Sequence, residues 1–290
     1  MTGTPESEKR KIVEYYVATT EASYIPNWGG ESLGFHFGLA DESTGSLAES
    51  VANTNGYLAE RARIGAGTRV LDAGCGVGGS AIWLAREKGA DVVGVSLVER
   101  QIQLAREFAE QRGVSDRTRF EVRDMAATGF PEASFEVVWN VESICHIADL
   151  AGYLAHVATL LVDGGTFACI DVCSGARPDA AVSRTVCDGW ALAALRSTEE
   201  IASALGSLGF EAVEIVDLTP RALKSAEALE GMASRSLMEL RVGQEFMGRP
   251  RNPVYEGHVR AGLAMAQGMR TGTTSLGHVL ARRPARERKT

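Results

Sequence analysis

The chain has 290 residues, 45% hydrophobic and 23% charged, enough for one large α/β domain or two small ones. Its formal net charge of −7 argues against non-specific binding to nucleic acid, which needs a basic surface. No stretch is apolar over the roughly 18 to 20 residues of a membrane span, and the N-terminus lacks the apolar run of a signal peptide. The five cysteines lack paired zinc-type spacing, so we expect reduced thiols, no metal site and a cytoplasmic location.

The first 63 residues contain two helical patterns separated by a different kind of segment. Apolar side chains recur at helical spacing over residues 7–20 and 45–63, which predicts two helices. Residues 24–38 are rich in glycine and aromatic side chains, and we expect a structured loop there. We therefore interpret residues 1–63 as an N-terminal helical cap or lid on a domain that spans residues 64–290.

From residue 69 onward, short apolar runs alternate with longer helical patterns. This alternation predicts an α/β fold with a mainly parallel sheet and helices on both faces. Strands are predicted at 69–73, 91–95, 118–122, 135–140, 166–171, 212–217 and 275–282, and helices at 80–88, 98–112, 149–161 and 197–208. Residues 220–271 are mostly helical in pattern, which predicts a helical insertion before the last strand.

A glycine-rich loop follows the first of these strands. Residues 70–79 indicate a buried strand that ends at Asp72, a tight turn and the start of a helix. Glycines in the turn let the backbone bend sharply and let a ligand approach without interference from Cβ atoms. Nucleotide-binding folds use similar turns, so the pattern alone is a weak signal. We expect a cofactor to lie against Asp72, Gly74, Cys75, Gly76 and Gly78.

The loop resembles motif I of class I S-adenosylmethionine (SAM) methyltransferases. That resemblance implies a Rossmann-like seven-stranded sheet with SAM as the cofactor. It also implies that the ribose lies near Ser96, Leu97 and Gln101, although an acid more commonly occupies this strand end in such folds. By the same resemblance, Asp124 accepts the adenine amino group and Met125 packs on the adenine ring. The alternatives are a turn residue at 96, a helix cap at 124 and core packing at 125.

The fourth predicted strand ends in residues that suit chemistry. Asn140 lies at the carboxyl edge of the sheet, where ligands bind in open α/β folds, so we assign it to the cofactor site. Glu142 and His146 are four residues apart and share a face if the segment forms a helical turn. A glutamate there can act as a base or stabilise a cation, and a histidine can orient it or take a proton. Both side chains can instead have a purely structural role.

Two segments point to a narrower group of methyltransferases. Trp139-Asn-Val-Glu-Ser-Ile-Cys-His146 resembles Glu-Ala-Thr-Cys-His of sterol side-chain methyltransferases and Trp-Asn-Asn-Glu-Ser of geranyl diphosphate C-methyltransferases. A further segment of the sterol enzymes resembles Trp28-Gly-Gly-Glu-Ser-Leu-Gly-Phe-His-Phe37 of this chain. The sequence of the glycine loop also resembles that of tocopherol methyltransferases. The resemblance implies methylation of an isoprenoid carbon–carbon double bond through a carbocation, with Glu142 and His146 as the catalytic residues. We expect the substrate to contact Tyr24, Trp28, Phe35, His36, Phe37 and Trp190, each of which is otherwise a core residue.

The acceptor is the least constrained part of this interpretation. Geranyl diphosphate enzymes have asparagines where this chain has residues 20–27, so we favour a prenylated aromatic or indole compound of secondary metabolism over a prenyl diphosphate. Cyclisation is an expected sequel to methylation, and Mg²⁺ is expected only for a diphosphate substrate. The alternative is N- or O-methylation of a small metabolite with Glu142 or His146 as general base. We also expect a homo-oligomer, with the first 20 residues covering the site of the same or a neighbouring subunit.

Overall fold

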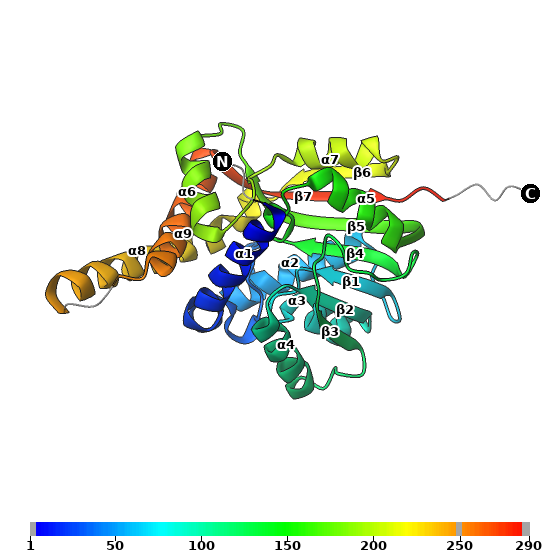
Figure 1. Cartoon of the computed structure of the whole chain (residues 1–290), viewed down its shortest axis with the longest axis horizontal. Helices are drawn as coiled ribbons and strands as arrows, with labels where there is room; N and C mark the ends of the chain where they lie inside the picture. Colours follow the sequence, from blue (N-terminus) through cyan, green and yellow to red (C-terminus); the bar gives the residue numbers. More distant parts are fainter. Residues whose placement is uncertain (1–3, 248–250, 286–290) are drawn as a thin grey trace, which may run out of the picture.

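The protein is described by a computed structural model that covers residues 4–247 and 251–285. Seven strands form one sheet in the order β3-β2-β1-β4-β5-β7-β6, in which β7 runs antiparallel to both of its neighbours (Figure 1). The strands are β1 (Arg69–Ala73), β2 (Asp91–Ser96), β3 (Thr118–Val122), β4 (Phe135–Val141), β5 (Leu161–Ser174), β6 (Glu211–Asp217) and β7 (Thr274–Arg282). This architecture confirms the predicted α/β Rossmann-like fold.

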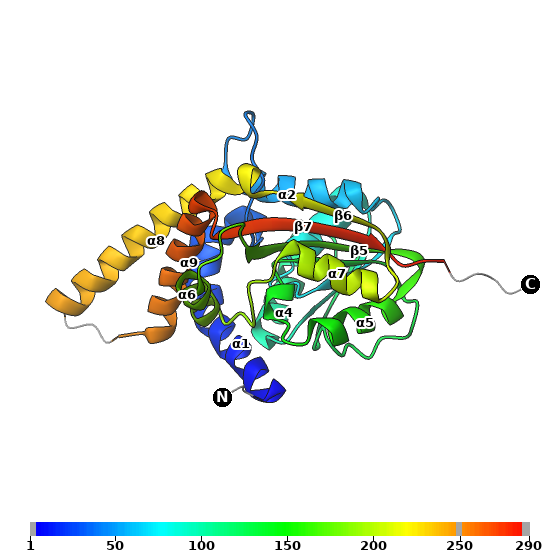
Figure 2. The same cartoon turned by 90° about the horizontal axis from the view of Figure 1, so that it is seen from above.

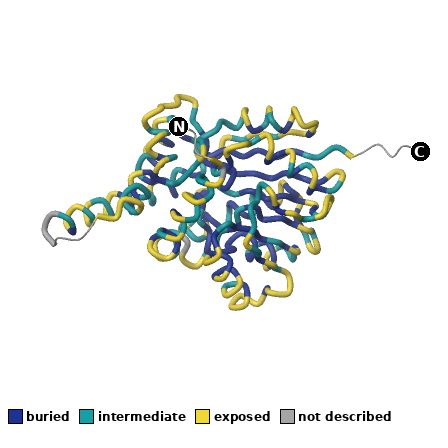
Figure 3. The backbone as a smooth tube through the Cα atoms, viewed as in Figure 1, coloured by how far each residue is buried: buried dark blue, intermediate teal, exposed yellow. Residues whose placement is uncertain are grey.

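Helices cover both faces of the sheet because side chains of a strand point alternately to the two sides. Val70 of β1 joins the core under α2 (Leu47–Arg61), α3 (Gly79–Trp83), the π-helix η3 (Leu84–Lys88) and α4 (Glu99–Gln111). Its neighbour Leu71 joins the core under α5 (Leu150–Leu160) and α7 (Thr198–Ser207). Figure 2 shows α2 on one side of the sheet and α5 and α7 on the other. Most residues of β1, β2, β4, β5 and β7 are buried, whereas the edge strands β3 and β6 are more exposed (Figure 3).

The strand order reverses beside β1, whose two neighbours are β2 and β4. Connections leaving the carboxyl ends of β1 and β4 therefore depart to opposite faces and leave a crevice between them. The glycine loop follows β1, and the segment with Glu142 and His146 follows β4. The fold thus brings together the two segments that the sequence singles out.

The N-terminal region departs from the prediction in one place. Helix α1 (Pro5–Thr19) continues into the π-helix η1 (Thr20–Gly29) and the short η2 (Gly30–Ser32), so the loop predicted from residue 24 begins only after residue 32. Tertiary contacts support this wide helix despite Pro26, because Tyr24 stacks on Phe35 with ring centroids 4.7 Å apart. In addition, the Trp28 indole N–H donates to the His36 carbonyl at 3.0 Å. The domain boundary predicted at residue 63 stays a prediction. Helix α2 lies before this boundary, but it packs in the same core as the sheet that lies after it.

The predicted helical insertion between β6 and β7 is present as two helices. Helices α8 (Thr219–Met247) and α9 (Pro253–Thr271) pack along each other, and the far half of α8 extends beyond the body of the molecule (Figures 1 and 2). Helix α6 (Ala180–Trp190), which the sequence analysis did not predict, packs against α9 and begins where Asp179 accepts two backbone N–H groups. Over the described ranges, none of the helices is long and apolar enough to cross a membrane.

Candidate active site

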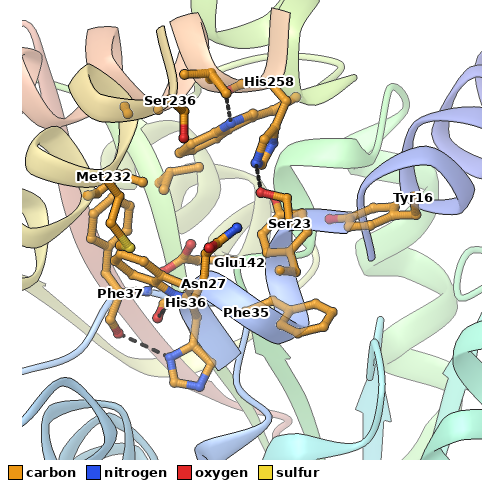
Figure 4. A pocket seen from close by; sticks show the side chains of 18 of the residues that line it. Tyr16, Ser23, Asn27, Phe35, His36, Phe37, Glu142, Met232, Ser236 and His258 are labelled. Carbon is orange, nitrogen blue, oxygen red and sulfur yellow. Dashed lines mark hydrogen bonds between the residues drawn. The ribbon is translucent and has the colours of Figure 1, made fainter. Parts of the chain in front are cut away.

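Two cavities meet above the carboxyl edge of β1 and β4. The first, which we call the loop cavity, lies between α1, the glycine loop and the ends of β2 and β3, with a volume of about 430 Å³. The second, the aromatic cavity, lies between η1, residues 35–37, α6, α8 and α9, with a volume of about 180 Å³. Five residues line both cavities and mark their junction: Tyr16, Phe35, His36, Glu142 and His146 (Figure 4).

Most of the residues predicted to hold a cofactor line the loop cavity. They are Asp72, Gly74, Cys75, Gly76, Ser96, Leu97, Gln101, Asp124 and Met125. Gly78 lies outside this lining, at the start of α3, where a Cβ atom would come within 2.9 Å of the Phe120 ring. Asn140 is fully buried beneath the loop and donates to the Ala73 carbonyl at 3.1 Å and to the Ser143 hydroxyl at 2.9 Å. The Asn140 side chain therefore links the end of β1 to the segment that follows β4.

Gly74 and Gly76 of the loop differ in what a side chain at each position would contact. Gly74 has a φ of 93°, and a Cβ atom there would lie 2.6 Å from Cβ of Ser143, so the fold itself requires glycine. Gly76 has a φ of 53°, but a Cβ atom there would meet only the Phe35 ring, at 3.7 Å. Since Gly76 lines the loop cavity, a side chain at this position would occupy space open to a ligand.

Asp72 provides a buried carboxylate in the wall of the loop cavity. The residue is 3% exposed, and its Oδ2 atom has no hydrogen-bond partner among the described residues. Burial raises the pKa of Asp72 to about 7, because removing a carboxylate from water penalises the charged form. An unpaired carboxylate oxygen in this position suits a ligand with a positive charge.

Helix α1 closes the loop cavity from the same chain. Nζ of Lys9 lies 2.7 Å from Oδ2 of Asp124, whose other oxygen accepts the backbone N–H of Ala126 at 2.8 Å. The Gln101 amide links Thr20, at the end of α1, to Ser96 at the end of β2, with hydrogen bonds of 3.1 and 2.9 Å. Ser96, through Gln101, and Asp124 thus anchor helix α1 over the loop cavity.

Glu142 lies at the junction of the two cavities in an unusual backbone conformation. Its φ of 49° is in the left-handed region, and its backbone N–H donates to the Ile170 carbonyl at 2.7 Å. Oε1 accepts the backbone N–H of Phe37 at 2.6 Å. Burial raises the pKa of Glu142 well above its usual value, and the nearby Asp171 adds to this shift. A strained backbone with a buried acid is typical of a functional position.

Asp171 of β5 holds the segment that carries Glu142 and His146. Its Oδ2 atom accepts the backbone N–H groups of Ser143 at 3.1 Å and Cys145 at 3.2 Å, and Oδ1 accepts that of Val172 at 2.8 Å. The sequence analysis missed this residue because an aspartate inside an apolar strand gives no motif. Its role follows only from the pairing of β4 with β5.

Both ring nitrogens of His146 are engaged. Nδ1 donates to the Ala191 carbonyl at 3.0 Å, so Nε2 accepts the Tyr16 hydroxyl at 3.0 Å. Burial lowers the pKa of His146 to about 4, so the imidazole is neutral at physiological pH. His146 thus lines the junction and also holds Tyr16 there. In the sequence, Tyr16 appears only as an apolar position of a predicted helix.

All six residues predicted to contact the substrate line the aromatic cavity: Tyr24, Trp28, Phe35, His36, Phe37 and Trp190. Ser23 and His258, which the sequence analysis did not single out, complete this wall (Figure 4). His258 lies far from the other residues in the chain, so no local pattern connects it with them. The cavity offers aromatic faces around one buried acid, Glu142.

Comparison with known proteins identifies the family. A family model described as a methyltransferase domain matches residues 70–165. The chain is 33% identical over 232 residues to 27-O-demethylrifamycin SV methyltransferase of Amycolatopsis mediterranei (strain S699), covering 77% of this chain and 84% of that protein. The chain belongs to the SAM-dependent methyltransferases. Sterol 24-C-methyltransferase of Eremothecium gossypii is 34% identical over 169 residues, which cover 56% of this methyltransferase and 44% of the sterol enzyme.

Solved structures share the fold of this methyltransferase. The 4+2 cyclase SpnF superimposes with a TM-score of 0.76 at 20% identity, covering 96% of this chain and 97% of the cyclase. Geranyl diphosphate C-methyltransferase from Streptomyces coelicolor A3(2) superimposes with a TM-score of 0.72 at 20% identity, covering 98% and 100% of the two chains. At this identity the likeness establishes the fold alone.

The loop cavity of this methyltransferase fits SAM. Asp72 leaves a buried carboxylate oxygen without a partner, and Gly76 leaves a cradle that a Cβ atom would fill. SAM carries positive charge on its amino group and its sulfonium, which suits a buried carboxylate. When bound there, SAM supplies an electrophilic methyl group. Asp72 and the glycine loop would hold it, and Glu142 would face the aromatic cavity beside it.

We expect SAM binding to release a proton from Asp72. The pKa of Asp72 is about 7 without ligand, so at pH 6 the carboxyl is mostly protonated, and a bound cation favours its ionised form. Calorimetric titration at pH 6 in two buffers of different ionisation enthalpy measures this release. We expect close to one proton for the wild-type protein and a clear reduction for Asp72→Asn. Equal release by the two proteins would show that Asp72 is not the group that responds to SAM.

Proposed function

We propose that this methyltransferase transfers the SAM methyl group to a carbon–carbon double bond of an isoprenoid chain and forms a carbocation. The observation that carries the proposal is the position of Glu142, a buried acid at the junction of the loop cavity and the aromatic cavity. An alkene has no proton to lose before it attacks the methyl group, so no strong base is needed at that stage. The site must instead stabilise a developing positive charge.

The surroundings of Glu142 suit this task. Aromatic rings present electron-rich faces to a cation, and Phe35 and Tyr24 form a stacked pair in the wall of the aromatic cavity. No ion pair involving Glu142 is found in the described residues, and burial is the main cause that raises the pKa of its carboxyl well above the usual value. A cation that develops beside this carboxyl favours its ionised form. The name of the sterol relative, a C-methyltransferase, supports the same reaction class.

For the acceptor we propose a neutral prenylated aromatic or indole compound of secondary metabolism. Within residues 4–247 and 251–285, no group of three or more histidine, cysteine, aspartate or glutamate side chains could hold a metal ion. A prenyl diphosphate would need Mg²⁺ or a cluster of basic residues in the aromatic cavity. Among the described residues, Arg235 of α8 is the one arginine that lines the aromatic cavity, and its side chain is exposed.

Activity on the neutral acceptor is therefore expected to be independent of Mg²⁺. Assays with and without a chelator such as EDTA compare the rate of methyl transfer to a geranylated indole. We expect equal rates, because none of the described side chains forms a metal site. Complete loss of activity in EDTA, restored by Mg²⁺, would instead favour a diphosphate acceptor.

N- or O-methylation is the second candidate function. It is favoured by the relative from Amycolatopsis mediterranei, whose name describes an acceptor lacking an O-methyl group. In that reaction, Glu142 or the Tyr16–His146 pair would accept the proton of a hydroxyl or amine. The position of the transferred methyl group, on carbon or on a heteroatom, separates the two reactions.

A further inference from the structure

A hydrogen-bonded chain of side chains leads from the wall of the aromatic cavity to helix α9. The Tyr24 hydroxyl lies 2.8 Å from the Tyr15 hydroxyl, which in turn lies 2.7 Å from Nδ1 of His258. Nε2 of His258 lies 3.0 Å from the Ser23 hydroxyl (Figure 4). Tyr24 lines the cavity, whereas the Tyr15 side chain is 4% exposed and bridges the other two. Every polar atom of this chain thus has a partner.

We infer that Tyr24, Tyr15 and His258 form a proton relay that completes the reaction by removing a proton from the methylated carbocation. The inference rests on the proposed alkene C-methylation, which must end by loss of a proton, by ring closure or by capture of water. In this arrangement Tyr24 is the catalytic residue, because it borders the acceptor. Tyr15, and then His258, which also lines the cavity, receive the proton from it in turn.

The proton transfers balance along this chain. The C–H electron pair beside the cationic carbon becomes the new π bond, and the released proton passes to the Tyr24 oxygen. Tyr24 gives its own proton to Tyr15, which gives its proton to Nδ1 of His258. The positive charge thus moves from the sulfonium to the carbocation and then to the imidazolium. No other reactant is consumed.

The environment of His258 suits the end of such a relay. Partial burial lowers its pKa to about 4, so the ring is neutral before the reaction and Nδ1 can accept a proton. A carbocation is a far stronger acid than an imidazolium, so the transfer is downhill. Each phenol, in contrast, has a raised pKa and cannot hold the negative charge itself, so the tyrosines pass protons without storing them.

The relay assigns separate tasks to the groups around the cation. Glu142 stabilises the positive charge, and its Oε1 is held by the Phe37 N–H. Tyr24 collects the proton from the side of the cavity formed by η1 and α9. The position of Tyr24 would therefore select which hydrogen is lost and hence which product isomer forms.

The test uses SAM with a trideuterated methyl group and four alkene probes: geranyl diphosphate, lanosterol, 3-geranylindole and a geranylated phenol. Tyr15→Phe removes only the central hydroxyl of the relay. We expect it to keep forming the carbocation, while the share of the wild-type isomer among methylated products falls about tenfold or more, replaced by hydrated or isomeric products. Tyr57→Phe is the matched control, because the Tyr57 hydroxyl has no hydrogen-bond partner among the described residues and Tyr57 lies outside both cavity linings.

The outcomes separate the relay from the reaction on which it rests. Label on a chain carbon in the wild-type product supports C-methylation, and an unchanged isomer ratio in Tyr15→Phe would then overturn the relay alone. Label on oxygen or nitrogen, or none of the probes methylated, would overturn C-methylation and the relay together. A changed ratio in both Tyr15→Phe and Tyr57→Phe would also count against the relay.

A second measurement needs no substrate. The ¹⁵N chemical shifts of the His258 ring, assigned with a His258→Gln variant, report which nitrogen carries the proton. We expect the proton on Nε2, with Nδ1 free to accept from Tyr15, and we expect the Nδ1 shift to move in Tyr15→Phe. A proton on Nδ1 in the wild-type protein at neutral pH would overturn the relay.

Discussion

Replacing Glu142 by glutamine is expected to reduce the turnover number about 100-fold or more while SAM affinity stays within a few-fold of the wild type. Glutamine has nearly the same shape and can still accept the Phe37 N–H with its carbonyl oxygen. It cannot supply negative charge to the developing cation. The loss therefore appears in the chemical step, measured as single-turnover methyl transfer at saturating SAM.

The matched control for this variant is Glu136→Gln, on the strand β4 that precedes Glu142. Glu136 is exposed and forms an ion pair with Arg69 at 3.5 Å, far from the junction of the cavities. An exposed ion pair contributes about 1 kcal/mol or less, so turnover should match that of the wild type. If Glu142→Gln also retained wild-type turnover, Glu142 would have no part in the mechanism.

Replacing Gly76 by valine is expected to weaken SAM binding about 100-fold or more. A Cβ atom at this position meets only Phe35 in the ligand-free protein, so the three added carbons enter the loop cavity. The left-handed backbone at Gly76 adds a cost in folding free energy of about 1–2 kcal/mol. Calorimetric titration with SAM and thermal unfolding of the unliganded protein measure the two effects separately.

Gly67→Val separates backbone strain from occupation of the cavity. Gly67 has a φ of 74°, a Cβ atom there would meet nothing within 4 Å, and the residue lies outside the loop cavity. We expect a similar loss of stability with unchanged SAM affinity. Normal SAM affinity in a folded Gly76→Val protein would contradict the assignment of the loop cavity to the cofactor.

The bounds of six strands were predicted to within one residue, because these strands form short apolar runs with clear ends. Strand β5 (Leu161–Ser174) is longer at both ends than the predicted 166–171. The predicted bounds of the first and third strands, 69–73 and 118–122, coincide with those of β1 and β3. The helices of η1 and α6 could not be predicted, since their support comes from distant segments. The Tyr24 ring of η1 lies 5.0 Å from the ring of His258, more than two hundred positions later, and α6 packs on α9 more than sixty residues later.

The residues of the site also differ in whether a local sequence pattern predicts them. The glycine loop and the segment after β4 carry local patterns, so most of their residues were singled out from the sequence. His258 bonds to Tyr15 across 243 positions, and Asp171 holds a turn 26 to 28 positions away, so neither has a local signature. Asn140 was assigned to the cofactor site from its position at the end of a predicted strand. Its side chain instead points into the structure beneath the loop, and it lies in neither cavity lining.

The proposed reaction is tested most directly by locating the methyl group that this enzyme transfers. The purified protein is incubated with trideuterated-methyl SAM and 3-geranylindole, each with and without EDTA, and the product is analysed by mass spectrometry and NMR. We predict an intact deuterated methyl group bonded to a former alkene carbon of the geranyl chain, at the same rate in both conditions. A methyl group on nitrogen or oxygen of this or any other acceptor, with the alkene untouched, would contradict the proposal.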